Sequence, residues 1–385
     1  MRVLLFSKAA TRAVYHRQYE QIATQPCVED LMVVVPPYWR EPHVGKIHLE
    51  AVTPRGYHLQ VTPLRWNGHY HLYYAPCLPR LIRQFRPDLV HIDEEVYNFA
   101  TYHAALAAQR AGAHAVAFCW QNIYRRYPPP FRWFEKALAR KLSGVIAGNA
   151  DAAQVLQQKG FRIPVGIIPQ YGVDTELFTP GDMPASPPFR IGYLGRLVPA
   201  KGIDVLLESL KSLPSDCEVW IAGEGDESPW RERAEQLGVA QRVHWLGAIP
   251  STHVAGFLRQ LHVLVLPSRT TPRWKEQFGR VLVEAMACGV PVIGSDSGEI
   301  PRVIGEGGLI FREGDAHHLA QQIRVLSEQT ELRLELSQAA RERAVRQFSM
   351  KKVAAEYVAF WESVMKKSHA RGCPEIGRQS DIPAL

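Results

Sequence analysis

The chain has 385 residues, of which 46% are hydrophobic and 22% are charged. These proportions are ordinary for a globular protein and exclude disorder over most of the chain, while the length exceeds what one hydrophobic core usually serves. The formal net charge of +7 is compatible with a nucleotide diphosphate, an anionic membrane surface or nucleic acid as partner, and equally with a simply basic enzyme.

The sequence shows no segment of the kind that places a protein in or across a membrane. No apolar run approaches the roughly 18 residues of a membrane-spanning helix, and the apolar start is too short for a secretory leader. The six cysteines include no C-x-x-C pair, and the fifteen histidines form no H-E-x-x-H motif. We therefore expect a cytoplasmic protein with reduced thiols and no metal site.

The first half of the chain alternates between buried strands and helices, which predicts a parallel sheet covered on both faces. We predict strands over residues 2–6, 31–35, 57–61, 89–92, 115–119, 145–147 and 165–169. We predict helices over residues 16–24, 78–85 and 97–111, and another that Asn149 caps. Residues 181–188 have the composition of a linker.

Residues 124–142 combine three prolines with a basic helix that carries Phe131, Trp133 and Phe134. A basic helix with exposed aromatic side chains could lie on an anionic bilayer. The alternative is that the aromatic side chains pack on the sheet and the basic face is solvated. Both interpretations are open at this point.

A second α/β series follows the linker. We predict its strands over residues 190–194, 219–222, 243–246, 263–267, 290–293 and 309–311. We predict its helices over residues 203–212, 229–237, 254–261, 280–288, 316–327 and 331–347, with a final amphipathic helix over 353–365. The sequence thus indicates two Rossmann-like halves, followed by a loose tail over 368–385.

The stretch from residue 275 to 298 places two carboxylates around a helix entry. Residues 280–288 have helix-forming composition, and residues 290–293 are apolar and β-branched like a buried parallel strand. Glu276 and Glu284 would lie about 12 Å apart if the interval were entirely helical. The two carboxyl groups of a hydrolytic acid pair lie only about 5 to 9.5 Å apart. The longer separation suits two carboxylates that bind hydroxyls at opposite ends of one ligand, with a phosphate of that ligand at the helix start.

The run E-Q-F-G-R-V-L-V-E-A-M-A-C-G-V-P-V-I, residues 276–293, resembles the signature of glycosyltransferase family 4, whose members are retaining, use nucleotide sugars and have the GT-B fold. Residues 172–180 resemble the family's G-V-D-x-x-x-F-x-P segment, which leads out of the first domain. The resemblance implies two Rossmann-like domains that face each other across a cleft. Residues 1–182 would form the acceptor-side domain, completed by a C-terminal helix within 350–367, and residues 189–349 the nucleotide-sugar domain.

The resemblance also implies roles for residues of the main stretch. Glu276 would bind hydroxyls of the transferred sugar, and the amides around Phe278 and Gly279 would meet sugar or phosphate. Glu284 would hold the ribose hydroxyls. The alternative for Glu284 is a surface ion pair on the helix.

A second motif, G-R-L-V-P-A-K-G at residues 195–202, follows a strand and opens a helix. Glycine permits close backbone approach, and two cations beside a helix start suit a pyrophosphate, although the spacing is not that of a Walker A loop. The run matches the family's G-R-L-x-x-x-K-G, which implies that Gly195, Arg196 and Lys201 contact the donor diphosphate. Gly223 and Gly225 follow another strand and form either a tight turn or, by the resemblance, a secondary donor contact.

The first domain departs from the family pattern at two loops. No glycine occurs in residues 7–24, where the family often has a Gly-Gly loop, and Trp120, Gln121 and Asn122 stand where many members place a histidine. Either other residues, with Lys8 and Gln121 as candidates, replace the missing groups of the site, or the activity of the protein is altered. The acidic loop at the carboxyl end of the 89–92 strand offers Glu94 and Glu95 as acceptor contacts, or is simply solvated.

These motifs together predict a retaining glycosyltransferase that moves a sugar from a nucleotide diphosphate sugar to an acceptor glycan or glycolipid, in polysaccharide or glycolipid biosynthesis. The implied mechanism needs no protein nucleophile, because the leaving diphosphate helps to deprotonate the acceptor while Arg196 and Lys201 stabilise its charge. No convincing D-x-D motif is present, so we expect no metal and no other cofactor.

Two other classes remain open on the sequence. One is another GT-B reaction, such as epimerisation or phosphorolysis, and the other is a nucleotide-sugar-binding protein without transfer. Nucleic-acid binding has only the net charge in its favour, and we expect none. A peripheral position at the inner face of a membrane depends on the interpretation of residues 124–142.

Overall fold

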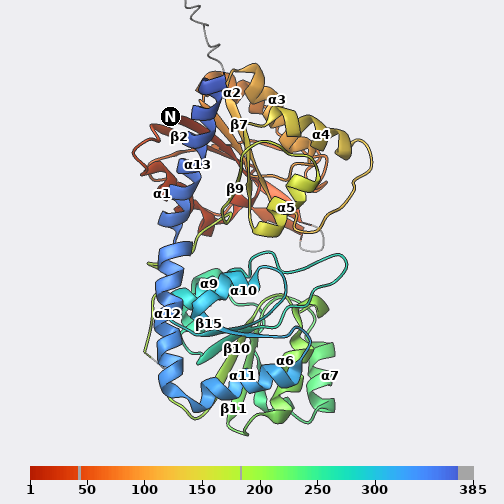
Figure 1. Cartoon of the computed structure of the whole chain (residues 1–385), viewed down its shortest axis with the longest axis vertical. Helices are drawn as coiled ribbons and strands as arrows, with labels where there is room; N and C mark the ends of the chain where they lie inside the picture. Colours follow the sequence, from red (N-terminus) through yellow and green to blue (C-terminus); the bar gives the residue numbers. More distant parts are fainter. Residues whose placement is uncertain (42–44, 183, 372–385) are drawn as a thin grey trace, which may run out of the picture.

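The computed structural model describes residues 1–41, 45–182 and 184–371. These residues form two α/β units stacked end to end, with the last two helices running along one side of both (Figure 1). Each unit has a parallel sheet with helices packed on both faces, as the alternation of elements predicted. The α/β fold class is therefore confirmed.

Within the described residues, the first unit is built on a seven-stranded parallel sheet of order β5-β2-β1-β6-β7-β8-β9. Its strands are β1 (Arg2–Phe6), β2 (Asp30–Val35), β5 (His58–Val61), β6 (Leu89–Ile92), β7 (His114–Cys119), β8 (Gly144–Ala147) and β9 (Val165–Ile167). Its helices are α1 (His16–Ala23), α2 (Leu78–Phe85), α3 (Phe99–Arg110), α4 (Phe131–Lys141) and α5 (Ala150–Gln158).

The second unit has, in the described part of the chain, a six-stranded parallel sheet of order β12-β11-β10-β13-β14-β15. Its strands are β10 (Phe189–Leu194), β11 (Cys217–Ala222), β12 (Val243–Trp245), β13 (Val263–Leu266), β14 (Val292–Ser295) and β15 (Gly308–Phe311). Its helices are α6 (Ile203–Ser209), α7 (Ser228–Gln236), α8 (Val254–Leu258), α9 (Arg280–Ala287), α10 (Ile300–Ile304), α11 (Ala316–Glu328) and α12 (Thr330–Phe348).

Side-chain alternation along β1 explains why both faces of the first sheet are covered. Leu4 and Phe6 belong to the core beneath α2 and α3, whereas Val3 and Leu5 belong to the opposite core. All four are buried to 2% exposure or less. A strand that is apolar on both faces is typical of a parallel sheet between two helical layers.

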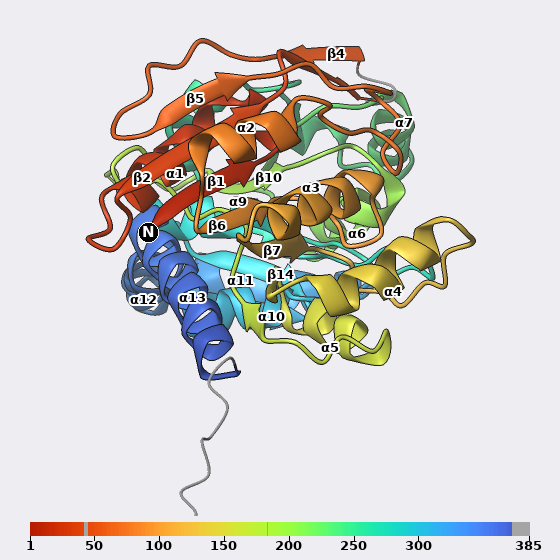
Figure 2. The same cartoon turned by 90° about the horizontal axis from the view of Figure 1, so that it is seen from above.

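The final helix, α13 (Met350–Arg371), returns to the first unit and covers the second face of its sheet. It packs against α1, and Figure 2 shows it beside α12 at one edge of the molecule. Trp361 is fully buried there, with its ring centroid 5.4 Å from that of His91 on β6. The predicted packing of the C-terminal helix on the first unit is thus confirmed.

The chain passes between the units twice, and the two passages are hydrogen bonded to each other. The Val173 amide donates to the Phe348 carbonyl at 2.7 Å, and the Met350 amide donates to the Val173 carbonyl at 3.0 Å. Ser349 is extended, which separates α12 from α13. These paired passages fix where the carboxyl ends of the two sheets meet.

Several elements differ from the sequence predictions, among them helix α10, which was not predicted, and helices α6 and α8, which are shorter than predicted. The hairpin of β3 (Tyr38–Glu41) and β4 (Gly45–His48) was not predicted, because the segment is polar and follows two prolines, and Trp39 is the buried side chain that anchors it. Strand β14 begins two residues later than predicted, since the Val290 amide is bonded to the last turn of α9. Helix α13 continues to Arg371, so residues 368–371, predicted as part of a loose tail, are helical, and residues 372–385 lie outside the described part.

Replacement of Trp361 by Ala tests the contribution of α13. The change empties a fully enclosed site, so we expect the free energy of unfolding to fall by about 3–5 kcal/mol in a denaturant titration. Trp133→Ala is the matched control, since Trp133 is 63% exposed and its removal should change stability by at most about 0.5 kcal/mol. Equal unfolding curves for the two variants would contradict the structural role of α13.

Candidate active site

The predicted donor residues lie on loops that leave the carboxyl ends of adjacent strands in the second sheet. Strand β10 leads into residues 195–202, and its neighbour β13 leads into residues 268–279, which we call the Glu276 loop. Gly202 lets these two loops meet, because its φ is +68° and a Cβ there would lie 1.9 Å from the Pro267 carbonyl oxygen. Ligands of open parallel sheets bind at this edge.

Lys201 and Glu276 form an ion pair where the two loops meet. The Lys201 Nζ lies 2.6 Å from Glu276 Oε2, and the Ser268 hydroxyl donates to the same oxygen at 2.8 Å. The Lys201 ammonium also lies 4.9 Å from the centroid of the Trp274 ring. Among the described residues no group is hydrogen bonded to Glu276 Oε1, so that oxygen is free to accept from a ligand hydroxyl.

Arg196 leaves the same loop as Lys201 but has a different environment. Its side chain is exposed, and the buried Tyr193 hydroxyl donates to its backbone carbonyl at 2.8 Å, which holds the loop in place. Within the described ranges its guanidinium has no carboxylate partner. An exposed, uncompensated guanidinium at the carboxyl end of a parallel strand can receive a phosphate.

Gly223 and Gly225 lie beside the loop that carries Gly195 and Arg196. A Cβ on Gly223 would lie 1.7 Å from the Gly195 carbonyl oxygen, and the φ of Gly223 is +154°. The Leu197 amide donates to the Glu224 carbonyl at 2.8 Å. Both glycines therefore have a packing role at this edge, and their predicted contact with the donor stays a prediction.

The Glu276 loop ends at Gly279, where α9 begins, so the helical spacing considered for Glu276 and Glu284 does not hold over the whole interval. Glu284 lies on α9 and pairs with Arg280 one turn earlier at 2.8 Å. Burial raises the pKa of Glu284, and the Arg280 guanidinium opposes part of that rise. Arg280 in turn lies 5.1 Å from the ring centroid of Tyr15 in the first unit.

Side chains of the first unit hold the Glu276 loop from the other side of the interface. The Asn149 side-chain amide donates to the Gln277 backbone carbonyl at 2.7 Å, and the Gln277 side-chain amide donates to the Trp120 backbone carbonyl at 2.9 Å. Lys275 pairs with Asp151 at 2.6 Å. The sequence identified Asn149 only as a helix cap, and nothing in the local pattern indicated that it reaches the second unit.

The four predicted acceptor-side residues separate into two clusters, and Lys8 and Glu94 form the first. Lys8 Nζ lies 2.5 Å from Glu94 Oε2 and within 5.3–5.8 Å of the ring centroids of Trp39, Tyr70 and Tyr73. Glu94 is buried, and its Oε1 has no hydrogen-bond partner among the described residues. Burial raises the pKa of Glu94, which Lys8 partly offsets.

Glu95 and Gln121 belong to the second cluster. Glu95 accepts from the Trp120 amide at 2.9 Å and from the Cys119 thiol at 3.1 Å. Gln121 accepts from Lys159 at 2.6 Å. Lys8 and Gln121 thus take part in separate networks, so the structure does not join them in one rebuilt site.

Trp120 is the first of the three residues that stand, by the resemblance, where many family members place a histidine. Its indole donates to Gln170 Oε1 at 2.9 Å, and its ring centroid lies 6.2 Å from that of Phe278 in the Glu276 loop. The ring fills the space over Gly148, where a Cβ would come within 2.2 Å of it. Trp120 therefore contributes to the contact between the two units.

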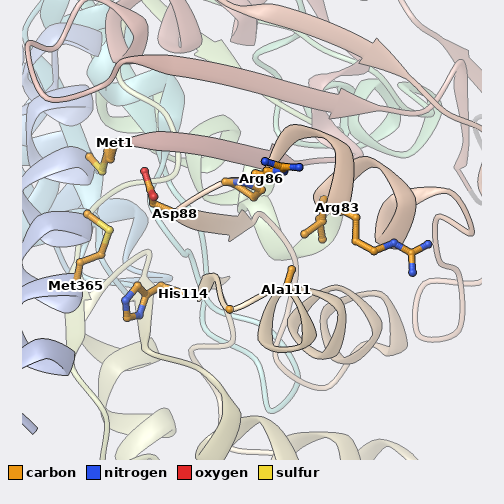
Figure 3. A pocket seen from close by; sticks show the side chains of 10 residues that line it. Met1, Arg83, Arg86, Asp88, Ala111, His114 and Met365 are labelled. Carbon is orange, nitrogen blue, oxygen red and sulfur yellow. The ribbon is translucent and has the colours of Figure 1, made fainter. Parts of the chain in front are cut away.

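A hollow of about 760 Å³ (Figure 3) is lined by Met1, Asp88 and His114, which lie at the amino ends of β1, β6 and β7, opposite the carboxyl ends that carry the predicted site. Arg83, Arg86 and His114 lie around it, and Figure 3 shows that the two guanidiniums and the imidazole do not converge on one point. None of the residues that line it belongs to the predicted site. Volume alone therefore does not mark the site in this protein.

Within residues 1–41, 45–182 and 184–371, no group of three or more histidine, cysteine, aspartate or glutamate residues is arranged to hold a metal ion. No helix in those ranges is long and apolar enough to cross a membrane.

The two facing α/β units, with their sites at the carboxyl ends of both sheets, define the GT-B fold. Solved structures that share this arrangement include the following two. The Anabaena protein HepE in complex with UDP has a TM-score of 0.72 at 19% identity, covering 94% of this chain and 100% of that one. Sucrose-phosphate synthase from Thermosynechococcus elongatus has a TM-score of 0.70 at 18% identity, covering 95% and 100%.

The chain belongs to glycosyltransferase family 4, as its motifs predicted. The family model described as Glycosyltransferase Family 4 matches residues 30–177, and the model described as Glycosyl transferases group 1 matches residues 183–343. Together these two matches cover most of both units.

Curated relatives include phosphatidyl-myo-inositol mannosyltransferase from Mycobacterium leprae, which is 32% identical over 60% of this chain and 61% of that protein. Another is D-inositol 3-phosphate glycosyltransferase from Corynebacterium glutamicum, which is 29% identical over 52% of each chain. The chain thus spans about half to two thirds of the length of these relatives.

Replacement of Asn149 by Asp tests whether the first unit holds the Glu276 loop. The variant keeps an oxygen to cap α5 but loses the amide that donates to the Gln277 carbonyl. One such bond contributes about 0.5–1.5 kcal/mol, so amide hydrogen exchange over residues 270–279 should rise about fivefold while the melting temperature changes little.

The matched control for this measurement is Asp315→Asn, which alters the cap of α11 away from the interface. Exchange over residues 270–279 should stay at the wild-type rate in that variant. Wild-type exchange in the Asn149→Asp variant would show that the loop keeps its order without the first unit.

Proposed function

We propose that the protein is a retaining glycosyltransferase that moves a sugar from a nucleotide diphosphate sugar to the hydroxyl of a glycan or glycolipid, in polysaccharide or glycolipid biosynthesis. The observation that carries the proposal is the Lys201–Glu276 pair at the edge of the second sheet, where it faces the first unit. The named activities of the curated relatives support it, as does the UDP bound to HepE.

On the donor side, the proposed roles follow from the charge and placement of each group. Lys201 and the exposed Arg196 would bind the diphosphate and stabilise the charge that develops on it as the sugar leaves. Glu276 would accept from sugar hydroxyls through Oε1, while Lys201 and Ser268 hold Oε2. Glu284 would bind the ribose hydroxyls once these displace part of its contact with Arg280.

The proposed reaction uses no covalent intermediate on the protein. The acceptor hydroxyl would attack from the face that the diphosphate leaves, and a diphosphate oxygen would take its proton, so the configuration at the sugar carbon is retained. The side-chain cations of Arg196 and Lys201 would neutralise the diphosphate charge in place of a metal. We propose that neither a metal nor another cofactor is required.

Replacement of Glu276 by Gln or of Lys201 by Ala should lower nucleotide-sugar turnover about 100-fold, because each change removes a charged contact to the reacting groups. A screen of nucleotide sugars by thermal shift first identifies the donor, since bound ligand stabilises the folded state. Turnover is then measured in EDTA, where the wild type should stay active.

Lys211→Ala is the control, because Lys211 is exposed in the same unit and away from the site. Product analysis by NMR should show the donor's anomeric configuration retained. Wild-type turnover in a folded Glu276 or Lys201 variant would rule out the assignment. Epimer formed without acceptor would favour an epimerase, and donor binding without turnover would favour a binding protein.

We further propose that the protein docks on an anionic membrane surface through residues 124–142. Phe131 and Phe134 are not available for this, since they pack against His71 and against α3. Tyr124 is 51% exposed and Trp133 is 63% exposed, with the exposed cation Lys136 on the same helix as Trp133. Exposed aromatic side chains beside cations suit the interface of an anionic bilayer.

Replacement of Trp133 by Ala should reduce sedimentation with phosphatidylglycerol vesicles about fivefold, because the indole no longer enters the interface. Trp66→Ala is the matched control, since Trp66 is 57% exposed elsewhere in the first unit. Binding of the wild type should also fall at high salt. Equal vesicle binding by the two variants would contradict docking through α4.

A further inference from the structure

A small cavity lies between the first unit and the Glu276 loop. Its volume is about 140 Å³, and it is lined by Glu95, Tyr97, Gln121, Asn122, Ile123, Arg125, Tyr127, Arg273, Trp274 and Gln277. Trp274 joins it to the donor side, because the Lys201 ammonium lies 4.9 Å from the Trp274 ring centroid. The cavity is thus adjacent to the position proposed for the transferred sugar.

Cations around the facing edges of the two units are almost all neutralised within the protein. Carboxylate partners are present for Lys8, Lys159, Lys201, Arg269, Lys275 and Arg280. Arg125 and Arg273 differ, since neither guanidinium has an ion-pair partner in the described part of the chain. Both line the same cavity, and the Arg125 guanidinium donates to the Arg273 carbonyl.

Both arginine side chains are exposed, so water and salt screen their repulsion, and an anion that binds between or beside them would be attracted by both charges. Glu95, the acidic side chain in the lining, pairs with neither arginine. Its oxygens already accept from the Trp120 amide and the Cys119 thiol, and burial raises its pKa. The positive charge of Arg125 and Arg273 is therefore left for a ligand.

The remaining lining suits a polyhydroxylated ligand. Tyr97 and Tyr127 stack with their centroids 4.2 Å apart, and Trp274 and Gln277 come from the opposite unit. The cavity is smaller than the ~300–1,000 Å³ of sites that enclose a drug-sized ligand. It has room for the end group of an acceptor, not for a long oligosaccharide.

We propose that Arg125 and Arg273 bind a phosphate or carboxylate group of the acceptor, next to the hydroxyl that receives the sugar. The inference rests on the proposed function and specifies its acceptor as an anionic, hydroxyl-bearing molecule. A guanidinium binds either anion through paired N–H donors, so both groups share this chemistry. A free sugar phosphate and a lipid headgroup are the two sources of such a phosphate.

The test is calorimetric titration of glucose 6-phosphate, glucuronate and glucose into protein already saturated with the nucleotide diphosphate that stabilises it most. The bound nucleotide occupies Arg196 and Lys201, which would otherwise capture the probe. We expect an anionic probe to bind at least about tenfold more tightly than glucose, and Arg125→Gln or Arg273→Gln to remove about tenfold of that affinity.

Arg126→Gln is the control, since Arg126 is exposed next in sequence, does not line the cavity and changes the net charge equally. Equal binding of glucose and both anionic probes overturns the inference, and so does undiminished anion binding in the Arg125 and Arg273 variants. Failure of every nucleotide diphosphate to bind would instead refute the proposed function. The two failures are therefore distinguishable.

The soluble probes test the inference itself. Sedimentation with vesicles then distinguishes the two sources of the phosphate. If the acceptor is a lipid, sedimentation with phosphatidylinositol vesicles should fall in Arg273→Gln, a position outside residues 124–142. If it is a free phosphate, Arg273→Gln should sediment like the wild type while it loses affinity for glucose 6-phosphate. Either pattern supports the inference and assigns the source.

Discussion

The ion pair between Lys201 and Glu276 is the contact on which the candidate site depends. It joins the loops that leave β10 and β13, which are neighbours in the second sheet, so the loops must cross the short gap between adjacent strands. Gly202 makes that approach sterically possible. The pair also sets the charge of the site, because one carboxylate oxygen is neutralised and the other stays free for a ligand. Arg196, outside this pair, has no carboxylate partner in the described residues, and we propose that it binds phosphate.

The position of the Glu276 loop is a property of both units. Its backbone accepts from Asn149, its Gln277 side chain donates to the first unit, and Lys275 pairs with Asp151. The paired passages of chain at Val173 and Ser349 act at the same interface, since they fix the relative placement of the two sheets. Any movement of one unit against the other must therefore strain or break contacts made by the loop that carries Glu276.

The distribution of charge is a second constraint on the interface between the units. The formal net charge of +7 does not indicate where the cations lie, and most cations at the interface have a carboxylate beside them. Arg196, Arg125 and Arg273 are three cations at the proposed site that have no such partner in the described residues. A phosphate bound at Arg196, and an acidic acceptor bound at Arg125 and Arg273, would each compensate positive charge that the protein itself leaves uncompensated.

The sequence by itself determined the two parallel sheets, the family and the residues of the donor motifs, because each depends on local periodicity or on a contiguous run such as residues 195–202 and 276–293. Only the tertiary structure decided which distant groups meet. It paired Lys201 with Glu276, directed the Asn149 amide across the interface, and placed Lys8 and Gln121 in different networks. Contacts between side chains that are far apart in the chain depend on how the two sheets are placed against each other, and the local sequence does not determine that placement.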